Sequence, residues 1–388
     1  MNRKASIDIF RALTMLMMIF VNDFAGMEDI PHWLRHARTT EDMLGFSDLV
    51  FPAFLFCVGL SIPFAIGARY RKGDNVLQVL GHIVLRTLAL IVMGVFSMNM
   101  RPVEGGLSRP VFTLLVIAGY FLVWNAYPRG KEGRTPVWVR ILQGCGVALL
   151  MGLVIYKDVN EMPFRHGWWG ILGLIGWAYL PCALAYVWMR GDWKKLTGFW
   201  LLTLLLCVLN AAPAIPKEWS IRAVILGFWP GGWTHPLICA TGMMTAMQLV
   251  RCEGQVKKWF TYCLLLAGSL FLLGLMSHRF WIISKNLATP AWAFFCLAIF
   301  VALFTLLHWV ADVKGRTRWA RVIAPAGTAT LTCYMMPSIW YAVQQLLVFS
   351  WPAVLTAGIP GLLKAFFFAL LMIGLTGLFT RIHLKLRI

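Results

Sequence analysis

Charged residues are scarce in this chain. They make up 13% of its 388 residues, and only 16 of them are Asp or Glu, whereas soluble proteins carry about 25% charged residues. Hydrophobic residues make up 60%, which excludes a disordered chain and is more than one soluble domain of this length buries. The 35 Lys and Arg residues suit a nucleic-acid-binding protein by charge, but the apolar content does not. A polytopic membrane protein remains.

The chain also lacks the motifs of soluble enzymes. It has no G-x-G-x-x-G, P-loop, G-x-S-x-G or H-E-x-x-H sequence, so any chemistry must come from residues that separate helices bring together. It has no C-x-x-C pair, and its nine cysteines lie mostly inside apolar runs, which indicates small buried side chains rather than disulfides or a metal site. His32 and His36 have the i, i+4 spacing of a helical metal site, but no second ligand pair accompanies them, and we expect no metal.

The apolar residues are grouped in runs, and a helix needs roughly 20 such residues to cross a bilayer. The run 322–349 is long and contains Pro325 and Pro337, so we expect it to kink or break. The longest connections, 27–45 and 213–233, leave no room for a soluble domain. We therefore predict an all-α polytopic membrane helix bundle of about 12 helices (range 10–12), a single transmembrane domain over residues 1–388. The runs cover residues 7–26, 46–68, 76–98, 110–126, 137–156, 168–189, 196–212, 234–250, 259–276, 290–310, 322–349 and 362–380.

The positive charge is unevenly distributed among the connections. If the N-terminus and every second connection lie on one side of the membrane, that side holds most of the 35 Lys and Arg residues, and no connection breaks the alternation. Cytoplasmic connections collect Lys and Arg, so we predict that both termini are cytoplasmic and that the cations contact anionic lipid. The first run is longer than the 7–15 apolar residues of a signal peptide, and no A-x-A site follows it, so we expect it to be retained.

Polar residues concentrate at the opposite face, near the ends of the runs. Polar groups are costly inside a bilayer, so their positions mark candidate sites. Each has a structural alternative: Asp23 and Asp48 can cap or solvate helix ends, and Asn22 can hydrogen-bond between packed helices. The concentration nevertheless predicts a binding or reaction site at this face. Its residues are Asn22, Asp23, His36, Asp48, His235, Lys285 and Asn286.

Five blocks of sequence stand out along nearly the whole chain. They are IDIFRA (7–12) with MIFVN (18–22), HA (36–37) with DLVFPAFLF (48–56) and GLSI (59–62), GILGLIGWAYL (170–180), KNL (285–287) and DVKG (312–315). Together and in this order they resemble the transmembrane acyltransferase family, which includes heparan-α-glucosaminide N-acetyltransferases and their bacterial relatives. The first block departs at Ala12, where the family usually has Gly.

The resemblance implies an enzyme that transfers an acetyl group from cytoplasmic acetyl-CoA to an amino sugar at the opposite, periplasmic face. The loop that ends at Asp48 lacks the family's usual tryptophan, so His32 stays open as an alternative to His36. The charge bias and the lack of a luminal extension favour a bacterial inner membrane, and the exposed apolar faces would permit a homodimer. The residues at the family's functional positions are His36 (the active-site histidine), Asn22 (the Asn of the first core helix), Asp48 (the Asp that opens the next helix) and the pair Lys285-Asn286.

Acyl transfer to an amine needs a general base, and imidazole titrates near neutral pH. It also needs a hydrogen-bond donor to the thioester oxygen. We expect His36 to be the base and Asn22 the donor, while Asp48 orients His36 or binds the sugar's amino group. Direct transfer is favoured over an acetyl-histidine intermediate. The remaining candidates are substrate-binding (Asp23, Lys285, Asn286 and His235) or meet the phosphates of CoA (Arg69, Arg71 and Lys72).

The alternative function is transport of an amino sugar or a related solute. Twelve spans with both termini inside is a common transporter layout. Transporter sites, however, lie near the midplane on broken helices, whereas the spans here carry few ionisable groups and no convincing repeat relates the two halves. The acyltransferase is therefore the preferred prediction.

Overall fold

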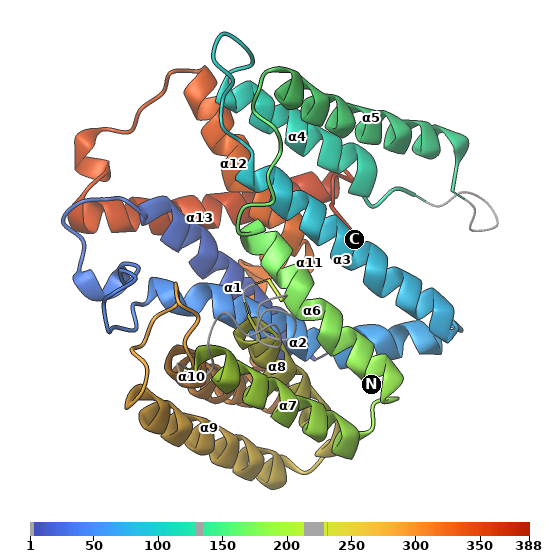
Figure 1. Cartoon of the computed structure of the whole chain (residues 1–388), viewed down its shortest axis with the longest axis vertical. Coiled ribbons are helices and arrows are strands. Elements are labelled where there is room, and N and C mark those ends of the chain that lie inside the picture. Colours follow the sequence, from blue (N-terminus) through green and yellow to red (C-terminus); the bar gives the residue numbers. More distant parts are fainter. Residues whose placement is uncertain (1–3, 129–134, 213–228, 231) are drawn as a thin grey trace. The chain divides into compact units, whose positions relative to one another are not determined.

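The computed structural model describes residues 4–128, 135–212, 229–230 and 232–388, so most of the predicted connection 213–233 lies outside the described residues. Within these ranges the chain forms helices and, apart from two isolated bridges, no strand (Figure 1). The α-helices are α1 (Ala5–Phe24), α2 (Ser47–Arg71), α3 (Val76–Met98), α4 (Arg109–Trp124), α5 (Val137–Val159), α6 (Gly170–Trp188), α7 (Trp193–Ala211), α8 (Thr234–Arg251), α9 (Val256–His278), α10 (Pro290–His308), α11 (Ala324–Thr328), α12 (Thr330–Leu346) and α13 (Gly358–Arg381).

Each predicted apolar run forms a helix. In the described part of the chain, nine helices are long and apolar enough to cross a membrane, which confirms the predicted polytopic helix bundle. Helices α4, α8 and α12 account for the other three runs. Helix α4 is apolar but has only 16 residues.

The long run 322–349 is broken, as expected for this run, although neither of its prolines lies at the break. It forms α11 and α12, which meet at Ala329, whose φ of −128° and ψ of 49° are not helical. Pro325 stands in the first turn of α11, where a missing N–H removes no helical hydrogen bond. Pro337 lies inside α12, which continues through it.

Helix α8 is less apolar than a lipid-facing span because it is surrounded by protein. Nearly all of its residues are buried. The hydroxyls of Thr241 and Thr245 each donate to the carbonyl one turn earlier, at 2.8 Å, so these buried polar groups are satisfied. The helix packs closely on α2, because a Cβ at Gly242 would collide with the backbone of Phe56.

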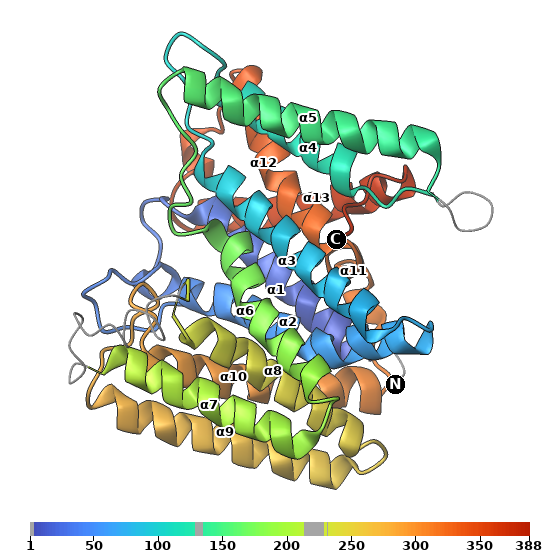
Figure 2. The same cartoon turned by 45° about the vertical axis from the view of Figure 1, so that its right-hand side comes forward.

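The chain divides into two compact units, each of which is described by itself. Unit 1 comprises Met1–Thr14, Pro31–Ile91 and Ile171–Trp319. In this unit α8 packs against α2 and α7, and α10 packs against α9. Figures 1 and 2 show α7, α8, α9 and α10 side by side.

Unit 2 comprises Met15–Ile30, Val92–Gly170 and Ala320–Ile388. Helix α4 packs against α5 and α12, and α13 packs against α11 and α12. The C-terminal segment lies beside the end of α4, where the Arg387 N–H donates to the carbonyl of Trp124 at 2.8 Å.

Within unit 1, the connections gather at two opposite ends of α2. At the Arg71 end, Lys4 pairs with Glu253 at 2.8 Å, and the Ala5 N–H donates to Asp312 at 2.9 Å. These segments were all predicted to lie on the side rich in Lys and Arg. The loops 31–46 and 279–289, predicted on the other side, meet at the Ser47 end of α2. This arrangement agrees with the predicted alternation, and which end faces the cytoplasm stays a prediction.

Candidate active site

Three of the predicted site residues meet in unit 1, at the start of α2. The Nδ1 atom of His36 lies 2.7 Å from Oδ1 of Asp48 and 3.2 Å from Nζ of Lys285. Lys285 Nζ is 3.7 Å from the same carboxylate oxygen. The Asp48 side chain is 3% exposed, whereas the His36 side chain is 42% exposed. A buried carboxylate therefore stands behind an accessible imidazole.

The loop before α2 folds back to place His36 over Asp48. A short 3₁₀ turn, His32–Leu34, is followed by a return of the chain in which the Phe46 N–H donates to the carbonyl of Trp33 at 2.8 Å. Gly45 fits against the backbone of Arg35, where a Cβ would collide with the carbonyl oxygen. A glycine at this position therefore permits the close return of the loop.

Asp48 does not cap its helix. The N-cap of α2 is Phe46, without a side-chain hydrogen bond, and the second carboxylate oxygen of Asp48 accepts the Ala37 N–H at 2.9 Å. Both oxygens thus hold the His36-Ala37 segment. This geometry favours the role of Asp48 in orienting His36 over its structural alternative as a cap.

Hydrogen-bond chemistry determines which nitrogen of His36 is free. An ionised carboxylate only accepts, so the bond to Asp48 places the hydrogen on Nδ1 and leaves a lone pair on Nε2. An ammonium only donates, so Lys285 acts on this pair through its charge. Nε2 of His36 has no partner among the described residues. It is therefore available to accept a proton from a substrate.

His32, the alternative histidine, has different surroundings. Its Nε2 pairs with Glu41 at 2.9 Å, and its side chain is 66% exposed. No described contact joins His32 to Asp48 or Lys285. Of the two candidates, His36 is the one that lies beside a buried carboxylate.

A second loop, residues 279–289, completes the cluster. Burial lowers the pKa of Lys285 from its usual 10.5, and the Asp48 carboxylate opposes that shift. Asn286 donates to the carbonyl of Ala37 and to Thr39, both at 3.4 Å, which are long contacts. The predicted Lys285-Asn286 pair thus lies against the loop of His36.

Asp42 ties the two loops together, a role that the sequence did not indicate. Its carboxylate accepts the Ile283 N–H at 2.8 Å and lies 2.8 Å from Nε2 of His278. The hydrogen bond from Ile283 lowers the pKa of Asp42 below its usual 3.8, and His278 adds to this effect. Asp42 and His278 are 236 residues apart, so no periodicity or motif in the sequence indicates that they are in contact.

His235 lies in the first turn of α8 and is buried. Its Nδ1 has no hydrogen-bond partner, and its ring packs edge-on to Phe51, at 5.3 Å between centroids. Phe51 stands one turn after Asp48 on α2. An unpaired buried ring nitrogen is costly, and a bound substrate could supply the missing hydrogen-bond partner. The role of His235 in substrate binding therefore stays a prediction.

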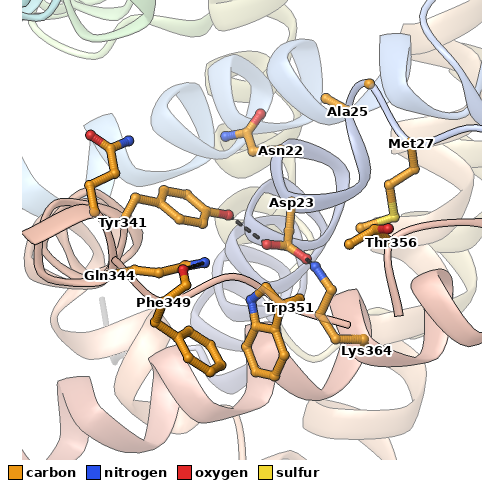
Figure 3. Close-up of a pocket in the computed structure, with 12 residues that line it drawn as sticks. Asn22, Asp23, Ala25, Met27, Tyr341, Gln344, Phe349, Trp351, Thr356 and Lys364 are labelled. Atoms are coloured by element: carbon orange, nitrogen blue, oxygen red, sulfur yellow. Dashed lines mark hydrogen bonds and ion pairs between the residues drawn. The ribbon is translucent and has the colours of Figure 1, made fainter. Parts of the chain in front are cut away.

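The predicted residues Asn22 and Asp23 lie in unit 2, at the end of α1, and line a separate pocket of about 420 Å³ (Figure 3). Asp23 accepts a hydrogen bond from the Tyr341 hydroxyl and pairs with Lys364 Nζ, both at 2.6 Å. Neither partner was predicted. A charged residue inside an apolar run, such as Lys364 in the last run, could have been singled out from the sequence, whereas nothing in the sequence distinguishes Tyr341.

The predicted CoA-binding residues lie at the other end of α2. Arg69 pairs with Asp74 at 2.6 Å, and Lys72 is exposed. Arg71 lines a cavity of about 320 Å³ in unit 1 together with Lys4, Asp8 and Arg11. Arg11 also donates to the Ser61 hydroxyl at 2.6 Å. The lining of this cavity contains more cationic than anionic side chains. Of these cations, the sequence predicted only Arg71 as a CoA-binding residue.

Metal ligands do not gather at either site. In the described ranges, no three His, Cys, Asp or Glu side chains lie close enough to share an ion. The expectation that the protein uses no metal stays a prediction.

Comparison with known proteins identifies relatives of this chain. A family model described as "Domain of unknown function (DUF5009)" matches residues 3–244. The chain is 36% identical to the heparan-alpha-glucosaminide N-acetyltransferase of Mus musculus over 351 residues, which covers 81% of this chain and 50% of the relative. It is 34% identical to the Homo sapiens protein of the same name over 107 residues, 27% of this chain and 15% of the relative. The chain thus spans about half the length of the mouse protein.

Proposed function

The chain belongs to the DUF5009 family, and on that premise we propose that it is a membrane acetyltransferase that uses acetyl-CoA to acetylate an amino sugar. The observation that carries this proposal is the pairing of His36 with the buried Asp48. It leaves an accessible imidazole nitrogen as a general base. The names of the mouse and human relatives supply the reaction type.

The proposed reaction gives each residue of the cluster one role. The acceptor's amine attacks the carbonyl carbon of the thioester, while Nε2 of His36 takes a proton from the nitrogen. The carbon–sulfur bond then breaks, and the thiolate of CoA takes up that proton from His36. Asp48 holds the ring in the productive tautomer and stabilises the imidazolium that forms in between, as in other carboxylate–histidine pairs.

Lys285 supports this base through its charge. The Lys285 ammonium lies 3.7 Å from the Asp48 carboxylate and 3.2 Å from Nδ1 of His36, so it offsets the negative charge of Asp48 beside the ring.

Asn22 stays the predicted donor to the thioester oxygen. Its side chain is exposed to the pocket of unit 2, and its amide makes no hydrogen bond to the residues that the structure describes. A free amide N–H is what an oxyanion donor requires. The assignment otherwise rests on the resemblance of the first block to the family.

The cavity at the Arg71 end of α2 supports the donor side of the proposal. Its guanidinium groups and the Lys4 ammonium suit the phosphates of CoA. Arg11 reaches α2 at Ser61, which is 13 residues from Asp48, a rise of about 20 Å along the helix. A donor bound here therefore needs a long thin arm to bring its thioester near His36, as the pantetheine of CoA provides.

The proposal is tested with the purified full-length protein, radiolabelled acetyl-CoA and glucosamine. His36→Ala should reduce formation of acetylated sugar by about 10²- to 10⁴-fold, the usual contribution of a general base. His32→Ala is the matched control, and it should retain activity. Equal loss in both variants, or accumulation of sugar inside vesicles without an acetyl donor, would contradict the proposal and favour a transporter.

Two finer points of the proposal have their own tests. Incubation with acetyl-CoA alone should leave no acetyl group on His36, because we favour direct transfer; a trapped acetyl-histidine would overturn that choice. In sealed inner-membrane vesicles, donor and acceptor should be required on opposite faces, with the donor on the cytoplasmic side. Full activity with both on one face would contradict transfer across the membrane.

A further inference from the structure

The pocket of unit 2 is built around a buried ion pair. Its walls come from the end of α1, from α12, from the segment 347–357 and from α13. At its base the Asp23 side chain is 4% exposed and the Lys364 side chain 10% exposed. Figure 3 shows the Asp23 carboxylate between the Tyr341 hydroxyl and the Lys364 ammonium, which engage one oxygen each.

This arrangement cancels the charge of the pocket. Among the described residues that line it, Asp23 and Lys364 are the charged ones, and they neutralise each other at 2.6 Å. Each oxygen of Asp23 holds one partner, and the Lys364 ammonium at 2.6 Å offsets the negative charge of the carboxylate. The charge of Lys364 is offset in the same way. The pocket therefore carries no net charge and does not favour a ligand of either sign.

The other polar groups of the lining are neutral amides and hydroxyls. Asn22 and Gln345 are exposed and have no partner in the part of the chain that the structure describes, and Gln344 uses only its Nε2 atom, on the carbonyl of Phe349 at 3.1 Å. Gln345 offers two N–H donors and an acceptor, and Gln344 keeps one N–H donor and its acceptor oxygen. Such groups match the hydroxyls of a ligand, each of which both donates and accepts.

Aromatic side chains supply an apolar surface beside these amides. Trp351 and Phe349 line the pocket and pack edge-to-face, with centroids 5.2 Å apart. Lys364 Nζ lies 5.8 Å from the Trp351 ring centroid, which positions the indole next to the ion pair. A ligand that combines an apolar ring face with a polar edge fits both surfaces.

From these observations we propose that the pocket lined by Gln344, Gln345 and Trp351 binds an uncharged, hydroxyl-rich ring, namely a sugar ring. Asp23 and Lys364 shape this pocket by holding each other and do not bind the charge of the ligand. If the ring belongs to the acceptor, which rests on the proposed function, the pocket admits its amine in the neutral form, and only the neutral amine is a nucleophile. The binding of an uncharged sugar ring does not depend on that activity.

Direct binding without acetyl-CoA tests the pocket. The full-length protein, in a detergent without a sugar head group, is titrated calorimetrically with methyl glucoside, with glucosamine at pH 6 and with glucose 6-phosphate. Methyl glucoside should bind, and neither charged analogue should bind more than threefold more tightly. No binding of methyl glucoside, or a charged analogue bound more than threefold more tightly, overturns the proposal.

Two amide variants locate the binding at this pocket. Gln345→Ala and Gln344→Ala should each weaken binding of methyl glucoside about three- to tenfold, the value of one lost hydrogen bond. Gln255→Ala is the matched control, an exposed glutamine outside the pocket, and it should bind like the unaltered protein. Unchanged affinity in both pocket variants overturns the proposal.

Charge variants test the function of the ion pair. Lys364→Gln frees the charge of Asp23, so glucosamine should then bind at least tenfold more tightly than methyl glucoside. The double variant Asp23→Asn, Lys364→Gln removes both charges, which proteins often tolerate better than one unpaired buried charge, and should restore equal binding. If the single variant does not fold, the double variant decides: glucosamine bound there more than threefold more tightly than methyl glucoside overturns the proposed role of the pair.

The outcomes separate this inference from the proposed function. Intact acetyl transfer with no sugar binding at this pocket contradicts the inference alone. Sugar binding that depends on Gln345, in a protein that transfers no acetyl group, contradicts the proposed function alone.

Discussion

Nδ1 of His36 lies 2.7 Å from Oδ1 of Asp48, although 12 residues separate them in the chain. The carboxylate is buried at the start of α2, and the imidazole is supplied by the preceding loop. The same carboxylate also accepts the backbone N–H of Ala37. One side chain therefore contributes to holding the loop and also sets the tautomer of the histidine.

Asp48→Asn should reduce kcat by about 10²- to 10⁴-fold with little change in KM, because the amide does not stabilise an imidazolium and can favour the wrong tautomer. Steady-state kinetics on the purified variant measure both constants. A thermal unfolding curve serves as the control for folding. A kcat within threefold of the unaltered protein would show that Asp48 has no part in catalysis.

Lys285→Met should move the acidic limb of the pH–activity profile to higher pH, by about one unit. Without the ammonium, the Asp48 carboxylate holds the proton on His36 more strongly, so a higher pH is needed to free Nε2. Lys285→Arg keeps the positive charge and should leave the limb near its original position. The profile of kcat between pH 5 and 9 measures the shift, and a limb that moves to lower pH would contradict the charge argument.

The tie between Asp42 and Ile283 should be lost in acid. The pKa of Asp42 is lowered in the folded protein, chiefly by the hydrogen bond from Ile283, relative to its usual 3.8. A carboxylate whose pKa is lowered by folding stabilises the folded form above its unfolded pKa, and this contribution is lost as the pH falls through the folded value. We therefore expect the loop 31–46 to be held at neutral pH and released below about pH 4.

Hydrogen exchange of the loop 31–46, corrected for intrinsic rates, measures this release between pH 3 and 6. Asp42→Asn should show the faster exchange already at pH 6. Equal protection of the unaltered protein and the variant at pH 6 would indicate that other contacts hold the loop.

The close crossing of α2 and α8 should tolerate no side chain at its centre. A Cβ at Gly59 would collide with the backbone of Cys239, and one at Gly242 with that of Phe56. Gly59→Ala and Gly242→Ala should each lower the free energy of unfolding by about 1–3 kcal/mol, the usual cost of overpacking. Gly268→Ala in α9 is the matched control, since nothing lies within 4 Å of the added Cβ. Thermal unfolding should show a lower Tm in the first two variants only.

The cation-lined cavity at the far end of α2 should affect binding of the donor and not chemistry. Arg71→Gln should raise the KM for acetyl-CoA about tenfold, as expected for one charge-assisted hydrogen bond, with kcat nearly unchanged. The effect should shrink at high salt. Lys195→Gln, at an exposed lysine outside the cavity, should have no effect; an equal rise in KM there would indicate a general effect of surface charge.

Local sequence was sufficient to predict the helices. The apolar runs correspond to α1–α10, to α12 with the short α11, and to α13. The run 322–349 breaks at Ala329, whereas α2, which also contains two prolines, Pro52 and Pro63, continues through them. The pairing of His36 with Asp48 was also predictable, because both residues flank one short loop and the resemblance marked them. Hydropathy acts within a single segment, so the sequence carries it directly.

Contacts between distant segments required the tertiary structure. The sequence suggested Asp23 as a substrate-binding residue, but Lys364, 341 positions away, occupies one of its oxygens, and Tyr341 occupies the other. Asp42 likewise meets Ile283 and His278 only because two loops come together. Each of these pairs forms through helix packing, which depends on how side chains fill the space between helices. The sequence by itself determined which segments are helical and which residues are chemically able to act; the packing alone decided whether a charged group has a partner within the protein or is left for a substrate.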